Sequence, residues 1–235
     1  MKLRNLFLSL AAVFATGAMA QDDCSFFFLN QEGQQMTRNC YNANGQLTNV
    51  LNYLVDKVYQ YEPGEEVIAN YKFTDANGKL LNSGQMVARC SNGDFSMSMG
   101  HVASFPDAMS MLNSDMFMMG DLMNYPDAMS DPDNIADEGD YDDGTIRLYQ
   151  KNDKNNRAEI NVTNREFVKN EIVETPAGPF NCTKVKYNVN LWSPKTKMEG
   201  YGYEWYAPNL GIVRTELYNK DGQLQSYTLL DKVMK

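Results

Sequence analysis

Residues 198–218 constrain the fold most, because they alternate with a period of two on both sides of a single break. Three aromatic residues share one parity before the break, namely Tyr201, Tyr203 and Trp205. Such a period is typical of a strand with one face on a core and one in water. Pro208 and Gly211 mark the break, so the stretch predicts two antiparallel strands joined by a short loop. We expect the three aromatic rings to form an apolar floor on the inner face of the sheet.

A glycine turn recurs along the chain, each time between runs typical of strands. It occurs at 42–47, 75–80 and 219–224, and a related turn occurs at 91–94. Asn-Gly and Asp-Gly supply the positive φ that tight hairpins need. About ten such runs, with a turn roughly every ten residues, predict an all-β antiparallel meander with little helix, folded as a curved sheet or half-barrel. No linker of biased composition divides residues 21–235, which are predicted to form one domain.

The N-terminal residues 1–20 resemble a secretory signal peptide. Lys2 and Arg4 precede a short apolar run, and Ala18-Met19-Ala20 supplies the small residues that a signal peptidase reads. The run is too short to span a bilayer, and the polar residues before Cys24 do not form a lipobox. We therefore expect a periplasmic or secreted protein that does not span the membrane. The alternative is a buried N-terminal helix.

The net charge argues against two classes of partner. The chain carries a formal charge of −9, and removal of Lys2 and Arg4 with the signal peptide moves it to −11. An acidic surface repels nucleic-acid phosphates and anionic membrane surfaces. We therefore expect neither nucleic-acid binding nor docking on an anionic bilayer.

The sequence contains four cysteines: Cys24, Cys40, Cys90 and Cys182. An even number in an exported chain favours disulfides, and the absence of a C-x-x-C pair argues against a zinc or thioredoxin-like redox site. Four cysteines allow three connectivities. We favour Cys24–Cys40 and Cys90–Cys182, because neighbours in a meander pair locally, with free buried thiols as the alternative.

Residues 101–143 interrupt the alternating pattern. Nine of the fifteen methionines lie between positions 97 and 129, and seven acidic residues lie between 131 and 143. A long insertion in a compact domain is usually functional or disordered. We expect a Met-rich lid with one or two helical turns within 108–123, followed by a solvated acidic loop.

Floor and lid together suggest a site for an acyl chain or another lipid-like ligand. The predicted ligand contacts are Tyr201, Tyr203, Trp205, Met97, Met99, Met116 and Met119. Methionine suits this role because its flexible thioether lines adaptable apolar surfaces. One alternative is a closed core with no small ligand. Another is a cell-envelope interaction protein that binds a partner protein through its sheet edges or acidic loop.

Catalysis and metal binding have weaker support. His101 is the only histidine, and no G-x-S-x-G motif is present. We therefore predict no enzyme activity and no cofactor. Asp137, Asp140 and Asp142 offer oxygen ligands for calcium, but the EF-hand spacing is absent. The methionines with His101 could ligate Cu(I), although packing on adaptable apolar surfaces is the stronger explanation.

Two motifs resemble a family of secreted Gram-negative domains of unknown function, some of which are called TapB-like. The motifs are the TPAGPFNCTK turn at 175–184 and the WYAPNLGIVRTE strand pair at 205–216. The chain departs from the family pattern at Pro179 and Asn209 and in its methionine content. The family is similar in shape to the lipoprotein carriers LolA and LolB. That likeness implies a curved sheet with an apolar concave face under a lid, although a fold alone does not establish a function.

Overall fold

The computed structural model of the chain describes residues 28–62, 64–91, 94–98, 116–125, 141–150, 153–194 and 197–235. These residues form thirteen strands, and they contain no helix, so none that could cross a membrane. The strands are β1 (Gln35–Asn42), β2 (Leu47–Tyr61), β3 (Gly64–Asp75), β4 (Leu80–Ser91), β5 (Asp94–Ser98), β6 (Met116–Gly120), β7 (Leu122–Tyr125), β8 (Gly144–Gln150), β9 (Asp153–Thr175), β10 (Gly178–Trp192), β11 (Lys197–Ala207), β12 (Gly211–Asn219) and β13 (Leu224–Met234).

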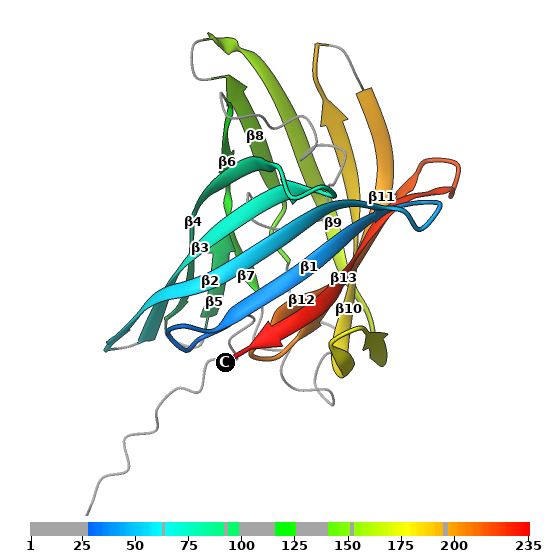
Figure 1. Ribbon diagram of the computed structural model, residues 1–235. Coiled ribbons are helices and arrows are strands. Elements are labelled where there is room, and N and C mark those ends of the chain that lie inside the picture. The colour runs from blue at the N-terminus through cyan, green and yellow to red at the C-terminus, as the bar shows by residue number, and fades with distance from the viewer. Residues whose placement is uncertain are drawn as a thin grey trace, which may run out of the picture.

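All thirteen strands belong to one sheet, in the order β6-β8-β9-β10-β11-β12-β13-β1-β2-β3-β4-β5-β7. Most neighbours in the sheet are also neighbours in the sequence, as in a meander. The last strand pairs with the first, with Cys40 opposite Thr228, so the two halves of the chain form one continuous wall (Figure 1). The predicted all-β antiparallel meander is confirmed, with thirteen strands in place of about ten.

Three of the hairpin turns that join neighbouring strands of the meander share one geometry. Their glycines have positive φ: Gly45 at 76°, Gly78 at 83° and Gly222 at 78°. In the first turn, Asn42 Oδ1 accepts hydrogen bonds from the backbone N–H groups of Asn44 and Gln46, each at 3.0 Å. The other two turns repeat both bonds. These φ values confirm the positive φ predicted for the three glycines. Glycine is needed at these positions because a side chain there would strain the backbone.

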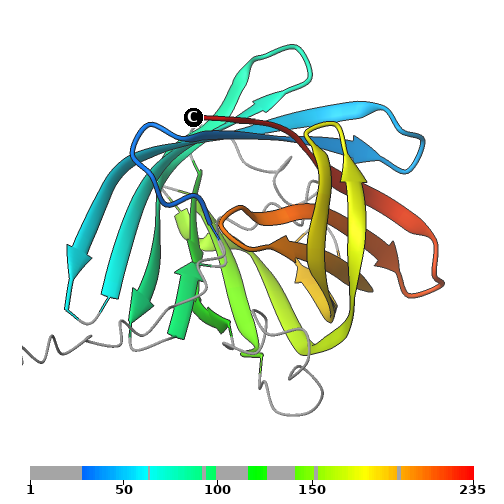
Figure 2. The ribbon, with the colours of Figure 1, turned by 90° about the horizontal axis from the view of Figure 1, so that it is seen from below.

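A strand that changes partner brings the two edges of the sheet together. β6 and β7 lie at opposite ends of the strand order, yet only Asp121 separates them in the sequence. β6 pairs with β8, with Gly120 opposite Ile146, and β7 pairs with β5, with Leu122 opposite Ser98. The two short strands therefore share one position in the wall. The sheet forms a nearly closed barrel with twelve strand positions (Figure 2).

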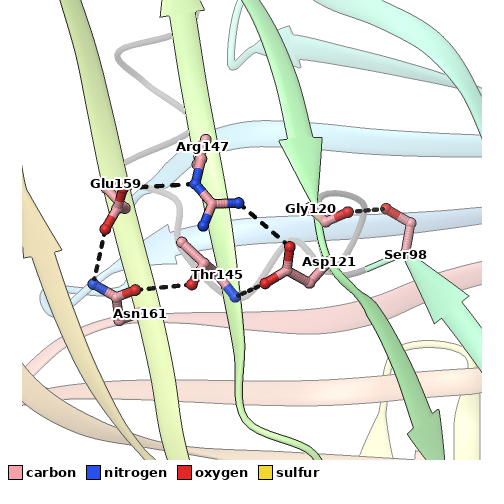
Figure 3. A network of polar contacts seen from close by, with 7 residues as sticks. All are labelled: Ser98, Gly120, Asp121, Thr145, Arg147, Glu159 and Asn161. Atoms are coloured by element: carbon pink, nitrogen blue, oxygen red, sulfur yellow. Dashed lines mark hydrogen bonds and ion pairs between the residues drawn. The ribbon is translucent and has the colours of Figure 1, made fainter.

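Polar contacts hold this seam at Asp121 (Figure 3). The Asp121 backbone N–H donates to Thr145 O at 3.0 Å, and its carboxylate accepts from Thr145 N–H at 2.9 Å. The same carboxylate lies 3.4 Å from Arg147 Nη1. On the other side, Ser98 Oγ donates to Gly120 O at 3.5 Å. One aspartate therefore fixes the point where the strand passes from β8 to β5.

The wall has a buried inner face and a partly exposed outer face. On β10, for example, Val185, Tyr187 and Val189 are fully buried, whereas Lys184 and Lys186 on the other parity are not. The buried residues of all the long strands form one core cluster. Alternation of this kind is expected for a barrel, where successive side chains point inward and outward.

β9 changes parity halfway along its length. Asn164 has φ of 52°, and the pairing of β9 with β10 shifts at this point. The Asn164 backbone N–H donates to Asp143 Oδ1 at 2.8 Å instead of to the neighbouring strand. One extra residue in a strand reverses the faces of all that follow. The shift places Arg165, with 6% of its surface exposed, in the barrel wall's inner face.

The predicted lid differs from the structure where its residues are described. Residues 116–125 are the strands β6 and β7, and not helical turns. The backbone groups at the edges of β8 and β5 would otherwise lack partners, and pairing with β6 and β7 satisfies them. The remainder of the predicted lid up to residue 140, and the predicted signal peptide, lie outside the described residues.

Candidate functional site in the barrel interior

The predicted aromatic floor lies on the outer face of the barrel. The inner face of β11 carries Gly202, Glu204 and Tyr206, which are all buried. The other face carries Tyr201, Tyr203 and Trp205. The shared parity of these aromatic residues was predicted correctly, but their assignment to the inner face was wrong. A ligand inside the barrel would not contact them.

The inner parity of β11 is set by a neighbour that the local sequence does not show. Tyr187 lies opposite Gly202 on β10 and is fully buried. A Cβ added to Gly202 would lie 2.3 Å from Tyr187 Cζ and 2.3 Å from its Oη. The ring therefore occupies the space that any other side chain at position 202 would need, and this fixes glycine on the inner face.

Cations cover the outer aromatic residues. Lys184 Nζ lies 4.0 Å from the ring centroid of Tyr203 and 4.5 Å from that of Trp205. Arg214 Cζ lies 5.3 Å from the Trp205 ring, and Trp205 Nε1 donates to Glu171 Oε1 at 2.8 Å. Trp205 is consequently only 4% exposed on the outer face. Burial lowers the pKa of Lys184, because its covered ammonium is partly removed from water.

The predicted methionine contacts do not gather in one place among the described residues. Met97 lies on the inner face of β5 and is 4% exposed, which agrees with an interior position. Met119 on β6 is 57% exposed and points away from the interior. Met116 begins β6, but its side chain lies outside the description, as does all of Met99.

One buried charge inside the barrel has a carboxylate partner. Arg165 Nη2 lies 3.5 Å from Glu204 Oε2 and 3.1 Å from Tyr206 Oη, and the Tyr206 hydroxyl donates to Glu204 Oε2 at 2.5 Å. The side chains of Arg165 and Glu204 are 0% and 6% exposed. The guanidinium also lies over the Tyr141 ring, with Cζ 5.5 Å from the centroid. This cluster is a neutralised ion pair, which is how buried charges are ordinarily stabilised.

A second buried charge has no carboxylate beside it. Arg38, on the inner face of β1, is 3% exposed. Its Nη2 donates to Tyr53 Oη at 2.9 Å, and its Cζ lies 5.2 Å from the Tyr53 ring centroid. Its Nε and Nη1 are buried without a hydrogen-bond partner among the described residues. No ion pair involving Arg38 is found in this part of the chain. Such a group is costly, so it is the first place to look for a ligand.

Two weakly acidic groups beside Arg38, Cys40 and Tyr53, stay protonated at neutral pH. Burial raises the pKa of Cys40 to about 12, although the Arg38 charge opposes the shift. Burial also raises the pKa of Tyr53, against the charge and hydrogen bond of Arg38. A neutral thiol and a neutral phenol cannot balance a guanidinium charge. The positive charge of Arg38 is therefore uncompensated by its described neighbours.

Neither predicted disulfide forms. Cys40 and Cys182 are free buried thiols. Cys40 lies opposite Thr228 on β13 and Asn49 on β2, so its neighbours in the wall offer no sulfur. Cys90 is disulfide-bonded, and its partner lies outside the described residues, as Cys24 does. The prediction assumed that cysteines close in the sequence would pair. It was wrong because adjacent strands of the wall need not place their cysteines opposite each other.

The predicted metal ligands lie mostly beyond the description. Asp142 is described, whereas Asp137, Asp140 and His101 are not. The residues that the structure describes contain no group of three potential metal-ligating side chains. The calcium and copper alternatives therefore stay predictions.

Neither Arg38 nor Glu204 was expected inside the barrel. Arg38 shares its parity with Met36 and Cys40, which is a signal that could have placed it on the inner face. Glu204 alternates with Tyr203 and Trp205, and a charged residue between aromatic ones indicates an outer position. Only the partner on β9, brought inward by the bend at Asn164, explains why a carboxylate is buried there.

Fold and interior together define a class: an all-β barrel made from one antiparallel meander, with an apolar interior that encloses two arginines. The chain belongs to the DUF3108-like family, because the sequence model of that family matches residues 31–230. The motifs at 175–184 and 205–216 that carried the sequence resemblance form the β9–β10 turn and the β11–β12 pair. The expectation of an exported domain from a family of unknown function is confirmed.

Two solved structures are closely similar to the chain. A candidate exported protein with a YmcC-like fold from Bacteroides fragilis is 65% identical, with a TM-score of 0.86, over 90% of this chain and 100% of its own. A candidate lipoprotein from Parabacteroides distasonis is 39% identical, with a TM-score of 0.84, over 90% of this chain and 100% of its own. The search of curated proteins gives no significant match. These relatives agree with an exported or envelope location. The Bacteroides fragilis protein is described as having a YmcC-like fold, and the likeness to LolA and LolB gains no support.

Proposed function

We propose that the protein is a non-catalytic exported binding protein, periplasmic or secreted, which holds a ligand with a long apolar portion inside its barrel. The observation that carries this proposal is the width of the barrel. Twelve strand positions give a wall radius of roughly 12 Å, against roughly 8 Å for eight strands at the same spacing and tilt. Eight strands already leave an interior that wall side chains fill, or that holds one small ligand. A wider interior therefore needs further apolar material.

The lining supports an apolar ligand. Inner-face side chains of β2, β3 and β4, such as Leu51, Val67, Ala69 and Met86, are at most 2% exposed. Such low exposure means that other atoms already cover these side chains, and their apolar chemistry favours acyl chains over polar solutes as the covering material. Unlike the predicted floor, this lining surrounds the interior from several strands, so the ligand would lie along the barrel and not across one pair of strands.

The proposal is tested by native mass spectrometry of the protein purified from its host's envelope fraction, followed by displacement of the neutral probe N-phenyl-1-naphthylamine. We expect a bound mass of a few hundred daltons and saturable probe fluorescence. The variant Ala69→Phe fills the inner face and should reduce probe binding, whereas Leu54→Phe at an exposed position should not. The proposal would be refuted if the mass spectrum showed only ligand-free protein and if the probe did not bind.

A second candidate is an envelope interaction protein with a closed core. Phe28 and Leu29, which precede β1, are 2% and 0% exposed, and the Phe28 ring packs edge-on against Tyr53 with centroids 5.5 Å apart. The chain thus contributes some filling of its own. This candidate predicts that neither lipid nor probe binds, and that a partner protein binds with the same affinity after detergent extraction of the barrel protein.

A further inference from the structure

The described residues place two buried arginines in the interior, in different electrostatic surroundings. Arg165 has Glu204 within ion-pair distance, at 3.5 Å. Among the described residues, Arg38 contacts the hydroxyl and the ring of Tyr53, and no carboxylate lies within ion-pair distance. Both arginines are almost fully buried. An arginine cannot shed its proton to escape burial, so the described residues leave the positive charge of Arg38 unbalanced.

The residues directly opposite Arg38 in the wall are apolar. Its partners across the sheet are Leu51 on β2 and Leu230 on β13, which are 1% and 0% exposed. On its own strand, Met36 at 1% lies on the same face. In such surroundings water does not solvate a lone charge. An anion that accepts hydrogen bonds from the guanidinium would therefore stabilise it strongly.

We propose that Arg38, with the hydroxyl of Tyr53, is the anchor for the anionic head group of an amphiphilic ligand, and that this ligand carries one negative charge, as a long-chain carboxylate does. The inference rests on the proposed function, because it assigns the polar end of the ligand held in the barrel. Arg38 Nε and Nη1 lack a hydrogen-bond partner among the described residues, so either can donate an N–H to a carboxylate, while Tyr53 holds the guanidinium in place through Nη2.

The charge count selects a monoanion. One guanidinium neutralises one carboxylate, and the surrounding leucines and methionine leave no second cation among the described neighbours on this face. A phosphate head group would bring additional negative charge into the same apolar wall, where it would lack a partner. The tail would then lie against the apolar inner face of β2, β3 and β4.

The test compares three ligands with the same sixteen-carbon chain: palmitate, hexadecanol and hexadecyl phosphate. Each competes with N-phenyl-1-naphthylamine for the full-length mature protein. Palmitate is expected to bind about 10- to 100-fold more tightly than hexadecanol, the range for a hydrogen-bonded charged group. Hexadecyl phosphate is expected to bind more weakly than palmitate.

Two variants assign that preference to one side chain. Arg38→Met removes the charge and keeps a flexible, unbranched, although shorter, side chain, and this variant should bind palmitate and hexadecanol equally. The matched control is Arg89→Met, at an arginine on the outer face of β4 whose side chain is 52% exposed and pairs with Glu66. It should keep the wild-type preference. Tyr53→Phe should lose part of the preference, because the guanidinium then lacks its hydroxyl acceptor.

The outcomes separate the two proposals. Equal binding of palmitate and hexadecanol to the wild-type protein, or an unchanged preference in Arg38→Met, would overturn the anionic anchor and leave a barrel ligand standing. Failure of all three ligands and of the neutral probe to bind would overturn the proposed function, and the anchor with it. The comparison on wild-type protein needs no variant to fold, so the inference stays testable in every case.

Discussion

The ion pair between Arg165 and Glu204 offers the sharpest test of how this interior is stabilised. Replacement of Glu204 by Gln removes the negative charge and keeps a side chain of nearly the same shape. The Arg165 side chain is 0% exposed, so it would be left buried with its charge unbalanced by Glu204. Breaking a buried pair in this way costs about 3–5 kcal/mol of the free energy of unfolding.

Arg165→Met should cost a similar amount, because it leaves the Glu204 carboxylate buried beside Tyr206. Glu204→Leu, which removes the carboxylate beside Arg165, should also cost a similar amount and is the second single variant of the cycle. The double variant Arg165→Met with Glu204→Leu removes both charges and should regain most of that loss, because well-packed apolar residues replace a buried pair at little cost. The expected coupling energy in the double-mutant cycle is therefore about 2 kcal/mol or more.

Urea unfolding followed by tryptophan fluorescence measures these differences, with thermal melting as a second assay. For a domain of this size, about 3–5 kcal/mol corresponds to a loss of roughly 6–20 °C in the melting temperature. Arg147→Met is the control, since its pairs with Asp121 and Glu159 are partly exposed and contribute about 0–1 kcal/mol. Single variants that unfold within 1 kcal/mol of wild type, or a double variant as unstable as the sum of the singles, would refute the reasoning.

Three further predictions follow from particular contacts. Gly202→Ala should lower the unfolding free energy by about 1–3 kcal/mol in urea titrations, because its Cβ would overlap the Tyr187 ring, and added replacement of Tyr187 by Leu should recover part of the loss. Asp121→Ala should speed hydrogen exchange in β6 and β7, while Asp121→Asn, which keeps the acceptor, should exchange as wild type; equal rates in all three would show that the seam does not depend on this residue. Burial raises the pKa of Cys40 and of Cys182 from 9.0 to about 12. The contribution of the two protonated thiols to stability is therefore complete below pH 9 and is lost as the pH rises towards about 12. A urea midpoint that stays constant from pH 8 to about 11 would contradict this pH dependence.

The sequence predicted the strands and turns well, because both depend on neighbours in the chain. The glycine turns at 42–47, 75–80 and 219–224 adopt the expected positive φ, since their geometry needs only Asn or Asp and Gly at fixed spacing. The alternation in 198–218 correctly gave two strands and a loop. Local chemistry was sufficient for each of these elements.

The candidate site was predicted poorly. A period of two divides residues between two faces without naming the inner one, and aromatic residues suit either face when cations cover them. Lys184 comes from β10 and Arg214 from β12, so the cover over Trp205 is a product of strand pairing. The strand pairing of residues 116–125 was also hidden, because each half is too short to show an alternating pattern.

By itself, the sequence determined a meander of β-hairpins and the residues that share a face within each strand. The tertiary structure decided which face is inside, that one strand closes the barrel by changing partners at Asp121, and that Arg38 and Arg165 are buried in unequal surroundings. The physical reason is that pattern and turn chemistry act over a few residues, whereas the burial of a charge depends on side chains delivered by strands far apart in the chain.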